Sequence, residues 1–345
     1  MKRILRPALA LVALSALAVP LAACGPGGVT LGDDWEGSKV FVLSKVNGLT
    51  TVVGIDPDRH RAESLAVVPT QKDDDDIQNP QIVRLTDGRW AVAIPKKNGK
   101  PSVLYQVDTK DHDLAGLGHV QGASTLVPAG SRTFAVSNAA LSPTQQAKAL
   151  VYDPATWQVE HQVPLPIDPT VTAGGESGVC ISEVTDTGSR VAVITPKSTD
   201  KQATVHTLTI KVENIACGPG KPVLAGSAKQ QTTDGPPTLQ LRTQDGMDIL
   251  TASAGNIRQV ASTRDTITAA ITLPHSVELV EVSRGDGREL HHMTIKDINE
   301  AQGMSETTPG TWVLAAGNRV VTADLTHSTS HSFKVPGELI DTPQA

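Results

Sequence analysis

The fold is decided by a short stretch that the chain repeats, and its clearest copy reads Gly-Arg-Trp-Ala-Val-Ala-Ile at residues 88–94. A turn glycine and a basic residue precede a continuous apolar run, which is typical of a strand buried on both faces. Similar stretches occupy residues 37–43, 130–136 and 188–194. The basic residues of the four copies are Lys39, Arg89, Arg132 and Arg190. Their spacing indicates a repeat of roughly 40–60 residues.

A second mark follows the first three copies: an apolar strand that ends in an aspartate and a turn. The three aspartates are Asp56, Asp108 and Asp153. Aspartate favours this position because its side chain accepts hydrogen bonds from the backbone of its own turn. Several short strands in each repeat predict an all-β fold, a β-propeller of six or seven blades over residues 38–336. The alternative fold is a pair of β-sandwich domains.

The C-terminal part repeats the pattern in compact form. Residues 310–315 echo residues 88–93, and Asp324 ends the strand that follows. We expect the stretch around Trp312 to complete a blade with the first strand of the body, and residues 337–345 to form a tail. Helical turns are expected only at residues 142–150 and 297–304.

These repeats make the chain resemble secreted bacterial propellers of the WD40-like and quinoprotein-like kind over most of residues 38–336. The resemblance implies the fold and carries no activity, because one fold hosts many functions. No Trp-Asp dipeptide recurs in the repeats.

The first 24 residues have the pattern of a signal peptide. Lys2, Arg3 and Arg6 precede an uncharged run, which ends in Leu-Ala-Ala-Cys at residues 21–24. This ending resembles a bacterial lipobox, which implies cleavage before Cys24 and a lipid on its sulfur. We therefore expect a signal peptide at residues 1–23, a flexible tether at residues 24–37 and a location on the extracytoplasmic face of the cell membrane.

The net charge bears on the class of binding partner, and the cysteine content predicts a disulfide. The formal net charge is −6, and it becomes −9 once the three basic residues of the signal peptide are removed. An acidic chain disfavours nucleic acid as a partner. Outside the cytoplasm disulfides persist, so Cys180 and Cys217 are predicted to pair. The alternative is two separately buried thiols.

Candidate chemical sites are few. Asp73, Asp74, Asp75 and Asp76 are weak candidates for calcium, but the spacing of an EF-hand loop is missing. Gly175–Val179 is similar to a nucleophile elbow but ends in valine, and residues 218–222 are similar to a fragment of a phosphate loop. His327 and His331 share a strand face without a third ligand. We expect no catalytic motif, metal or cofactor.

Aromatic residues are also scarce, with three Phe, two Tyr and four Trp. Trp90 and Trp312 occupy matching repeat positions, which favours a place in the blade core. Trp35 in the tether and Trp157 after a turn are expected to be freer to contact a partner.

Three functions remain open. The favoured one is a lipid-anchored binding or scaffold protein that presents propeller loops to a protein or a cell-envelope partner. The second is a secreted propeller enzyme of the lactonase, lyase or quinoprotein type with a site at the central channel. The third is a solute-binding lipoprotein, a class that usually alternates strands with long helices.

Overall fold

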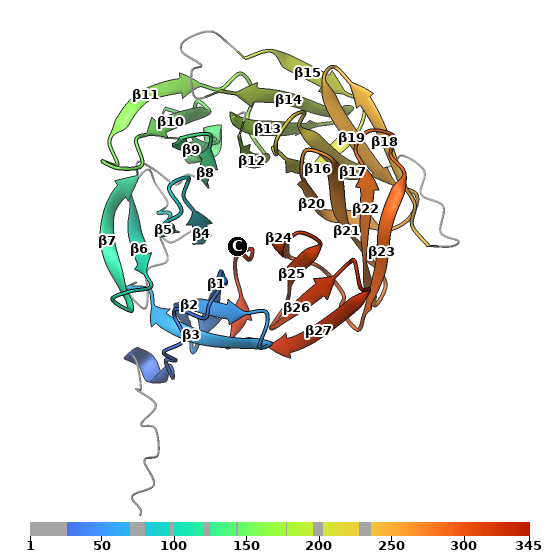
Figure 1. Cartoon of the computed structure of the whole chain (residues 1–345). Helices are drawn as coiled ribbons and strands as arrows, with labels where there is room; N and C mark the ends of the chain where they lie inside the picture. The colour runs from blue at the N-terminus through green and yellow to red at the C-terminus, as the bar shows by residue number, and fades with distance from the viewer. Residues whose placement is uncertain are drawn as a thin grey trace, which may run out of the picture.

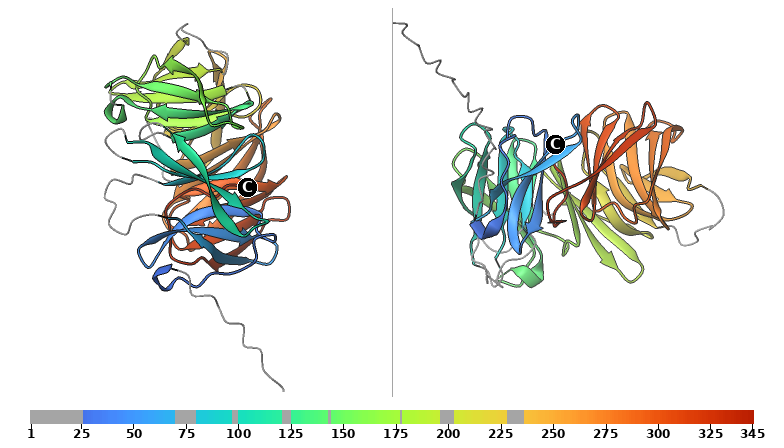
Figure 2. Two further views of the ribbon diagram at one scale, coloured as in Figure 1. Left: turned by 90° about the vertical axis from the view of Figure 1, so that its left-hand side faces the viewer. Right: turned by 90° about the horizontal axis from the view of Figure 1, so that it is seen from below.

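The computed structural model describes residues 26–69, 80–96, 100–120, 125–142, 144–176, 178–195, 203–227 and 236–345. In these residues, seven four-stranded sheets stand as blades around a central axis (Figure 1). Side views show the blades as separate twisted sheets placed face to face around the ring (Figure 2). The predicted β-propeller is confirmed with seven blades, and the alternative of two β-sandwich domains is wrong.

The first four blades are numbered along the chain, and their strands are given from the innermost to the outermost. Blade 1 contains β28 (Glu338–Leu339), β1 (Val40–Val46), β2 (Leu49–Asp56) and β3 (Arg61–Val67). Blade 2 contains β4 (Gln81–Arg84), β5 (Trp90–Ile94), β6 (Ser102–Asp108) and β7 (Asp113–Val120). Blade 3 contains β8 (Thr125–Ala129), β9 (Arg132–Ser137), β10 (Lys148–Tyr152) and β11 (Val159–Pro164). Blade 4 contains β12 (Val171–Gly175), β13 (Gly178–Thr185), β14 (Gly188–Ile194) and β15 (Val205–Leu208).

The remaining blades follow the same inner-to-outer order. Blade 5 contains β16 (Lys211–Ala216), β17 (Val223–Ser227), β19 (Met247–Ala252) and β18 (Leu239–Gln244). Blade 6 contains β20 (Asn256–Ser262), β21 (Thr266–Leu273), β22 (Ser276–Ser283) and β23 (Glu289–Lys296). Blade 7 contains β24 (Gly303–Thr308), β25 (Thr311–Ala316), β26 (Arg319–Asp324) and β27 (Thr329–Lys334). Two short 3₁₀ turns are η1 (Pro26–Gly28) and η2 (Ala139–Leu141).

One apolar cluster fills each of the seven seams between neighbouring blades. The alternation of side chains along a strand explains how one strand serves two seams. On β1, Val40 and Val42 face blade 7, whereas Phe41 and Leu43 face blade 2. The continuous apolar runs in the sequence are therefore strands that are buried on both faces.

The ring is closed by the C-terminus, which lies near the centre of the view in Figure 1. β28 pairs with β1, and the amide N–H of Ile340 donates to the carbonyl of Leu43. Further along, Phe41 and Gln344 exchange two backbone hydrogen bonds. Residues 338–345 thus line the inner edge of blade 1, and placing 337–345 in a tail outside the propeller was wrong. Trp312 does not close this blade, because its strand β25 belongs to blade 7.

The side chain of Asp341 connects the C-terminal segment to blade 2 through a hydrogen bond. The backbone N–H groups of Ile82 on β4 and of Thr342 donate to the side chain of Asp341. Burial outweighs these hydrogen bonds and raises the pKa of Asp341 from 3.8 to about 7. Between pH 3.8 and about 7, Asp341 therefore keeps its proton in the folded chain and loses it in the unfolded chain. The contribution of Asp341 to stability is full below pH 3.8 and is lost as the pH rises through about 7.

Blade 5 departs from the simple antiparallel meander. β17 pairs with β19 in parallel, and β18 is the outermost strand although it precedes β19 in the chain. The chain therefore passes first to the outer edge of the blade and returns to the third position. Another difference concerns residues 188–194, which form the third strand of blade 4, whereas the other three repeat copies lead into second strands.

The expected helical turns were also wrong. Residues 148–152 form β10, and η2 lies before the predicted segment. In the second segment Ile298 and Ala301 are buried at the seam between blades 6 and 7, and β24 begins at Gly303.

The predicted disulfide is present at the seam between blades 4 and 5. Cys180 on β13 is bonded to Cys217, which follows β16, and their Cα atoms are 5.7 Å apart. Both residues belong to the apolar cluster of that seam. The bond therefore joins two blades across a sequence separation of 37 residues.

Removing this crosslink should lower the free energy of unfolding by about 4 kcal/mol, because the unfolded chain regains the entropy of an open loop. The measurement is denaturant unfolding of a Cys180→Ala/Cys217→Ala variant beside the wild type with and without reductant. Reduced wild type is the control for packing lost by truncating the side chains. Equal stability of oxidised and reduced wild type would contradict the prediction.

Candidate functional site

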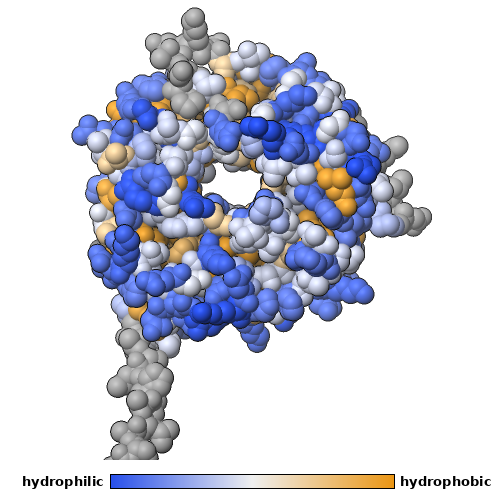
Figure 3. All heavy atoms as spheres, viewed as in Figure 1, coloured by the Kyte–Doolittle hydropathy of each residue, from blue (hydrophilic) through white to orange (hydrophobic). Residues whose placement is uncertain are grey.

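The strand directions divide the turns between the two ends of the ring. Turns from first to second strand and from third to fourth strand lie at one end, which we call the pocket face. Turns from second to third strand and most connections between blades lie at the other end, the connection face. Four pockets lined by described residues lie at seams, near the strand ends of the pocket face. Figure 3, a view along the ring axis, shows an open centre and a mainly hydrophilic surface.

The largest of these four pockets lies between blades 1 and 2 and has a volume of about 580 Å³. We call it the strap pocket, because residues 26–37 run along blade 1 beside it and form what we call the strap. The lining comes from the end of the strap, from the turn before β5 and from the turn after β6. Its lining residues are Trp35, Glu36, Ser38, Phe41, Asp87, Gly88, Arg89, Trp90, Gln106, Val107, Asp108, Thr109 and Lys110.

The aromatic wall of the strap pocket is formed by rings that contact one another. Trp35 is only 2% exposed and stacks on His112, with the ring centroids 5.8 Å apart. Trp90 is half-buried, lies 5.0 Å from Phe41 between ring centroids, and has the guanidinium of Arg84 at 5.6 Å. The expectation that Trp35 is free to contact a partner was wrong, because its ring completes the apolar cluster between blades 1 and 2.

The polar wall is organised by Arg89. Its Nε donates to Asp87 Oδ2 at 2.7 Å, and its Nη1 donates to Gln106 Oε1 at 3.3 Å. Its Nη2 donates to the carbonyl of Pro154 in blade 3 at 2.6 Å. Arg89 therefore ties the rim of blade 2 to the neighbouring blade and fixes the carboxylate that it contacts.

Two of the three carboxylates that line the strap pocket, Asp87 and Asp108, have a lowered pKa. Burial alone raises the pKa of Asp87, but hydrogen bonds from the side chain and backbone of Arg89 outweigh it and leave that pKa below its usual value. The backbone N–H groups of Asp111 and Lys110 lower the pKa of Asp108. A carboxylate that stays ionised accepts hydrogen bonds well and is a poor proton donor at neutral pH. The strap pocket therefore places ionised carboxylates beside an aromatic wall.

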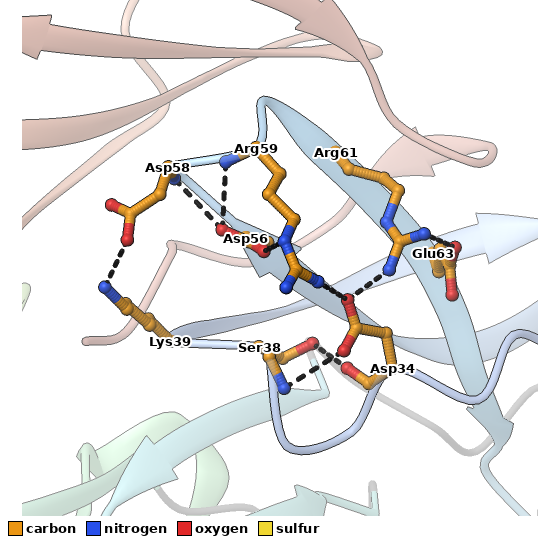
Figure 4. A network of polar contacts seen from close by, with 9 residues as sticks. Asp34, Ser38, Lys39, Asp56, Asp58, Arg59, Arg61 and Glu63 are labelled. Carbon is orange, nitrogen blue, oxygen red and sulfur yellow. Dashed lines mark hydrogen bonds and ion pairs between the residues drawn. The ribbon is translucent and has the colours of Figure 1, made fainter.

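The strap is fixed to blade 1 by a network of charged side chains (Figure 4). Asp34 forms ion pairs with Arg61 and, at 3.5 Å, with Arg59, and its Oδ1 accepts the N–H of Gly37 at 3.1 Å. The hydrogen bond from Arg61 is the main reason that the pKa of Asp34 is lowered. Further back, the N–H of Gly32 donates to the carbonyl of Ser64 on β3.

This packing corrects the expectation of a flexible tether at residues 24–37. Within the strap, Val29 and Trp35 are 1% and 2% exposed. Sequence reasoning missed the contact because the Gly-rich, acidic composition of the segment is typical of a flexible linker. The signal that could have found it is the pair of large apolar side chains within that composition.

The other candidates from the sequence do not form a common site. Cys24 and Asp73–Asp76 lie outside the described residues. His327 contacts Asp324 at 2.8 Å, whereas His331 stacks on His60 across the seam between blades 7 and 1. Gly175 and Gly178 face each other in the tight hairpin between β12 and β13, so no elbow into a helix forms there. Trp157 is half-buried beside Tyr152, which leaves it less free than expected.

Two structural features bear on the expected functions. In the described part of the chain, no three His, Cys, Asp or Glu side chains come together in a way that could hold a metal ion. No described helix is long and apolar enough to cross a membrane.

Comparison with known proteins supports the fold and goes no further. No protein-family model matches the chain, and no curated protein matches it either. A propeller from Bacteroides uniformis, provisionally named a 6-phosphogluconolactonase, aligns with a TM-score of 0.58 and 9% identity over 88% of this chain and 98% of its own. One from Bacteroides fragilis with the same provisional name gives 0.53 and 9% identity over 90% and 98%.

A chain of the mitotic checkpoint complex aligns equally far, with a TM-score of 0.52 and 12% identity over 95% of this chain and 99% of its own. Proteins with such different names align about equally well. At these identities the similarity shows the shared architecture alone.

Loss of the ion pairs at Asp34 should loosen the strap. We expect an Arg59→Gln/Arg61→Gln variant to be cleaved after Glu36 by a glutamate-specific protease about fivefold faster than wild type, a modest increase because exposed ion pairs contribute little individually. An Arg288→Gln variant, which alters an exposed pair elsewhere on the rim, should be cleaved at the wild-type rate. Equal rates for all three proteins would contradict the role given to Asp34.

Proposed function

We propose that this chain is a lipid-anchored, extracytoplasmic binding protein that holds its pocket face away from the membrane. The lipobox at residues 21–24 supplies the anchor. The observation that carries the orientation is the course of the strap. Its start lies at the connection face, where the carbonyl of Gly28 accepts a hydrogen bond from Asn47 in the turn between β1 and β2.

The strap then passes β3 and reaches the pocket face at Asp34, beside the turn that joins β2 to β3. The strap therefore first contacts blade 1 at Gly28 and Val29, within five residues of Cys24, at the end of the ring opposite the pockets. A lipid on Cys24 leaves little free tether, so the connection face lies toward the bilayer. The strap pocket then points toward partners outside the membrane.

The chemistry of the strap pocket supports binding over catalysis. Asp87 and Asp108 stay ionised at neutral pH, and the guanidinium of Arg89 is engaged by three protein acceptors. These groups suit a partner that offers hydroxyl or amine donors, such as a sugar unit of the cell envelope or a polar side chain of a partner protein. A solute-binding lipoprotein is less favoured, because the described elements are strands and two 3₁₀ turns.

The orientation is tested with a fluorescent label on lipid-anchored protein bound to vesicles that contain a headgroup quencher. A label on Lys45→Cys, at the connection end of β1, should be quenched strongly. A label on Lys110→Cys, in the turn from β6 to β7 at the pocket face, should be quenched weakly. The Cys24→Ser form of each protein is the control and should not bind vesicles. Equal quenching at both sites, or vesicle binding by the Cys24→Ser form, would overturn the proposal.

The enzyme alternative rests on the provisional name of the two Bacteroides propellers. Hydrolysis of 6-phosphogluconolactone by the purified protein, above the spontaneous rate and abolished by heat, would replace the binding function with catalysis. We expect the spontaneous rate only.

A further inference from the structure

A second pocket, chemically opposite to the strap pocket, lies between blades 5 and 6. It has a volume of about 490 Å³. We call it the cationic pocket, and its lining residues are Gly220, Lys221, Asp248, Arg264, Asp265, Ser283, Arg284 and Gly285. It contains part of the segment at residues 218–222 whose sequence is similar to a fragment of a phosphate loop.

The base of this pocket is a buried ion pair. The side chains of Arg284 and Asp248 are 9% and 3% exposed, and Arg284 Nε donates to Asp248 Oδ2 at 2.8 Å. The hydroxyl of Thr243 donates to Asp248 Oδ1 at 2.8 Å. This ion pair depends on the irregular strand order of blade 5. Because β19 is parallel to β17, it starts at the pocket face, and Asp248 near its start lies there.

Arg284 also holds the walls of the pocket in place. Its Nη1 donates to the carbonyls of Pro219 at 2.7 Å and Thr263 at 2.9 Å, and its Nη2 donates to the carbonyl of Lys221. These contacts join the turn before β17 in blade 5 to the turn before β21 in blade 6. The positions of Lys221 and Arg264, one on each turn, therefore depend on a single rigid clamp.

The charges of the pocket do not balance. Asp248 is neutralised by Arg284, and Lys221 Nζ lies 3.9 Å from Asp248 Oδ1 while its side chain is 52% exposed. Arg264 is exposed and has no ion pair within the part of the chain that the structure describes. Three cationic side chains thus face the two carboxylates of Asp248 and Asp265, which leaves one positive charge in excess. The strap pocket has the reverse excess, with three carboxylates and two cations.

We propose that the cationic pocket binds an oxyanion that carries one negative charge, such as a carboxylate or a phosphodiester. Lys221 and Arg264 donate to the oxyanion from opposite walls, since lysine and arginine both form charge-assisted hydrogen bonds with such groups. Glycine suits position 220, because its φ of +88° is one that other residues rarely adopt. A bound monoanion neutralises the one excess positive charge of the pocket lining.

The test is NMR titration of the Cys24→Ser chain with dimethyl phosphate, acetate or tetramethylammonium chloride at constant ionic strength. We expect saturable shifts of the Gly220 and Gly285 amide signals with dimethyl phosphate or acetate. The anion with the higher affinity identifies the ligand as a phosphodiester or a carboxylate. The cation should cause no saturable shift at either glycine.

A Lys221→Gln/Arg264→Gln variant should bind the preferred anion at least about tenfold more weakly, because two charge-assisted contacts are lost. Arg284 is left intact in it, so the clamp and the fold are preserved. An Arg288→Gln variant removes an exposed charge outside the lining and should bind like wild type. The proposal is overturned if neither anion gives a saturable shift, if the double variant binds as well as wild type, or if Arg288→Gln weakens binding equally. The result is independent of the proposed membrane orientation.

Discussion

Backbone hydrogen bonds between the last residues of the chain and β1 are the interaction on which the rest of the structure depends. A propeller blade has apolar residues on both faces, so every blade needs two neighbours. Residues 338–345 complete the inner edge of blade 1, and Leu339 and Ala345 add to the apolar cluster that joins the first and last blades. Without that closure, β1 would present an unpaired edge and the seams beside blade 1 would be open to water.

The pockets lie where the seams between blades reach the pocket face. The interior of each seam is apolar, whereas its end at the pocket face holds turns with charged side chains. Arg89 and Arg284 each bind a carbonyl of a neighbouring blade there, and each keeps a carboxylate beside a pocket. The same ring thus presents one pocket with an excess of carboxylates and one with an excess of cations. The two pockets differ in charge through a few turn residues, while the apolar strands of the seams remain alike.

The sequence predicted those parts of the fold that are periodic and apolar. The strand at residues 88–94 and its copies indicated doubly buried strands, and Cys180 and Cys217 indicated a disulfide that is present. The order of β18 and β19 was not predictable, because both strands have ordinary patterns and only their partners differ. Residues 188–194 matched the repeat locally, yet they occupy the third position of their blade, since a turn glycine and a basic residue suit either hairpin.

The sites were harder to predict, because their residues are distant in sequence. Asp248 and Arg284 meet only through the irregular path of blade 5, and no local motif encodes that pairing. Trp35 lay in a segment whose composition is that of a linker, although its ring packs between two blades. In the cationic pocket, residues 218–222 contribute through their place beside Arg284 and Arg264, and their similarity to a phosphate loop is incidental.

Complementation by a peptide tests ring closure most directly. The chain is truncated after Pro336, and its thermal unfolding is followed with and without a synthetic peptide of residues 337–345. The account predicts a lower melting temperature for the truncated chain and its recovery as the peptide concentration rises, because the peptide adds the missing inner strand. A peptide carrying Leu339→Asp, which places a charge at the seam between blades 7 and 1, should restore nothing. A truncated chain that melts like the full chain would contradict the claim that the C-terminus closes the ring.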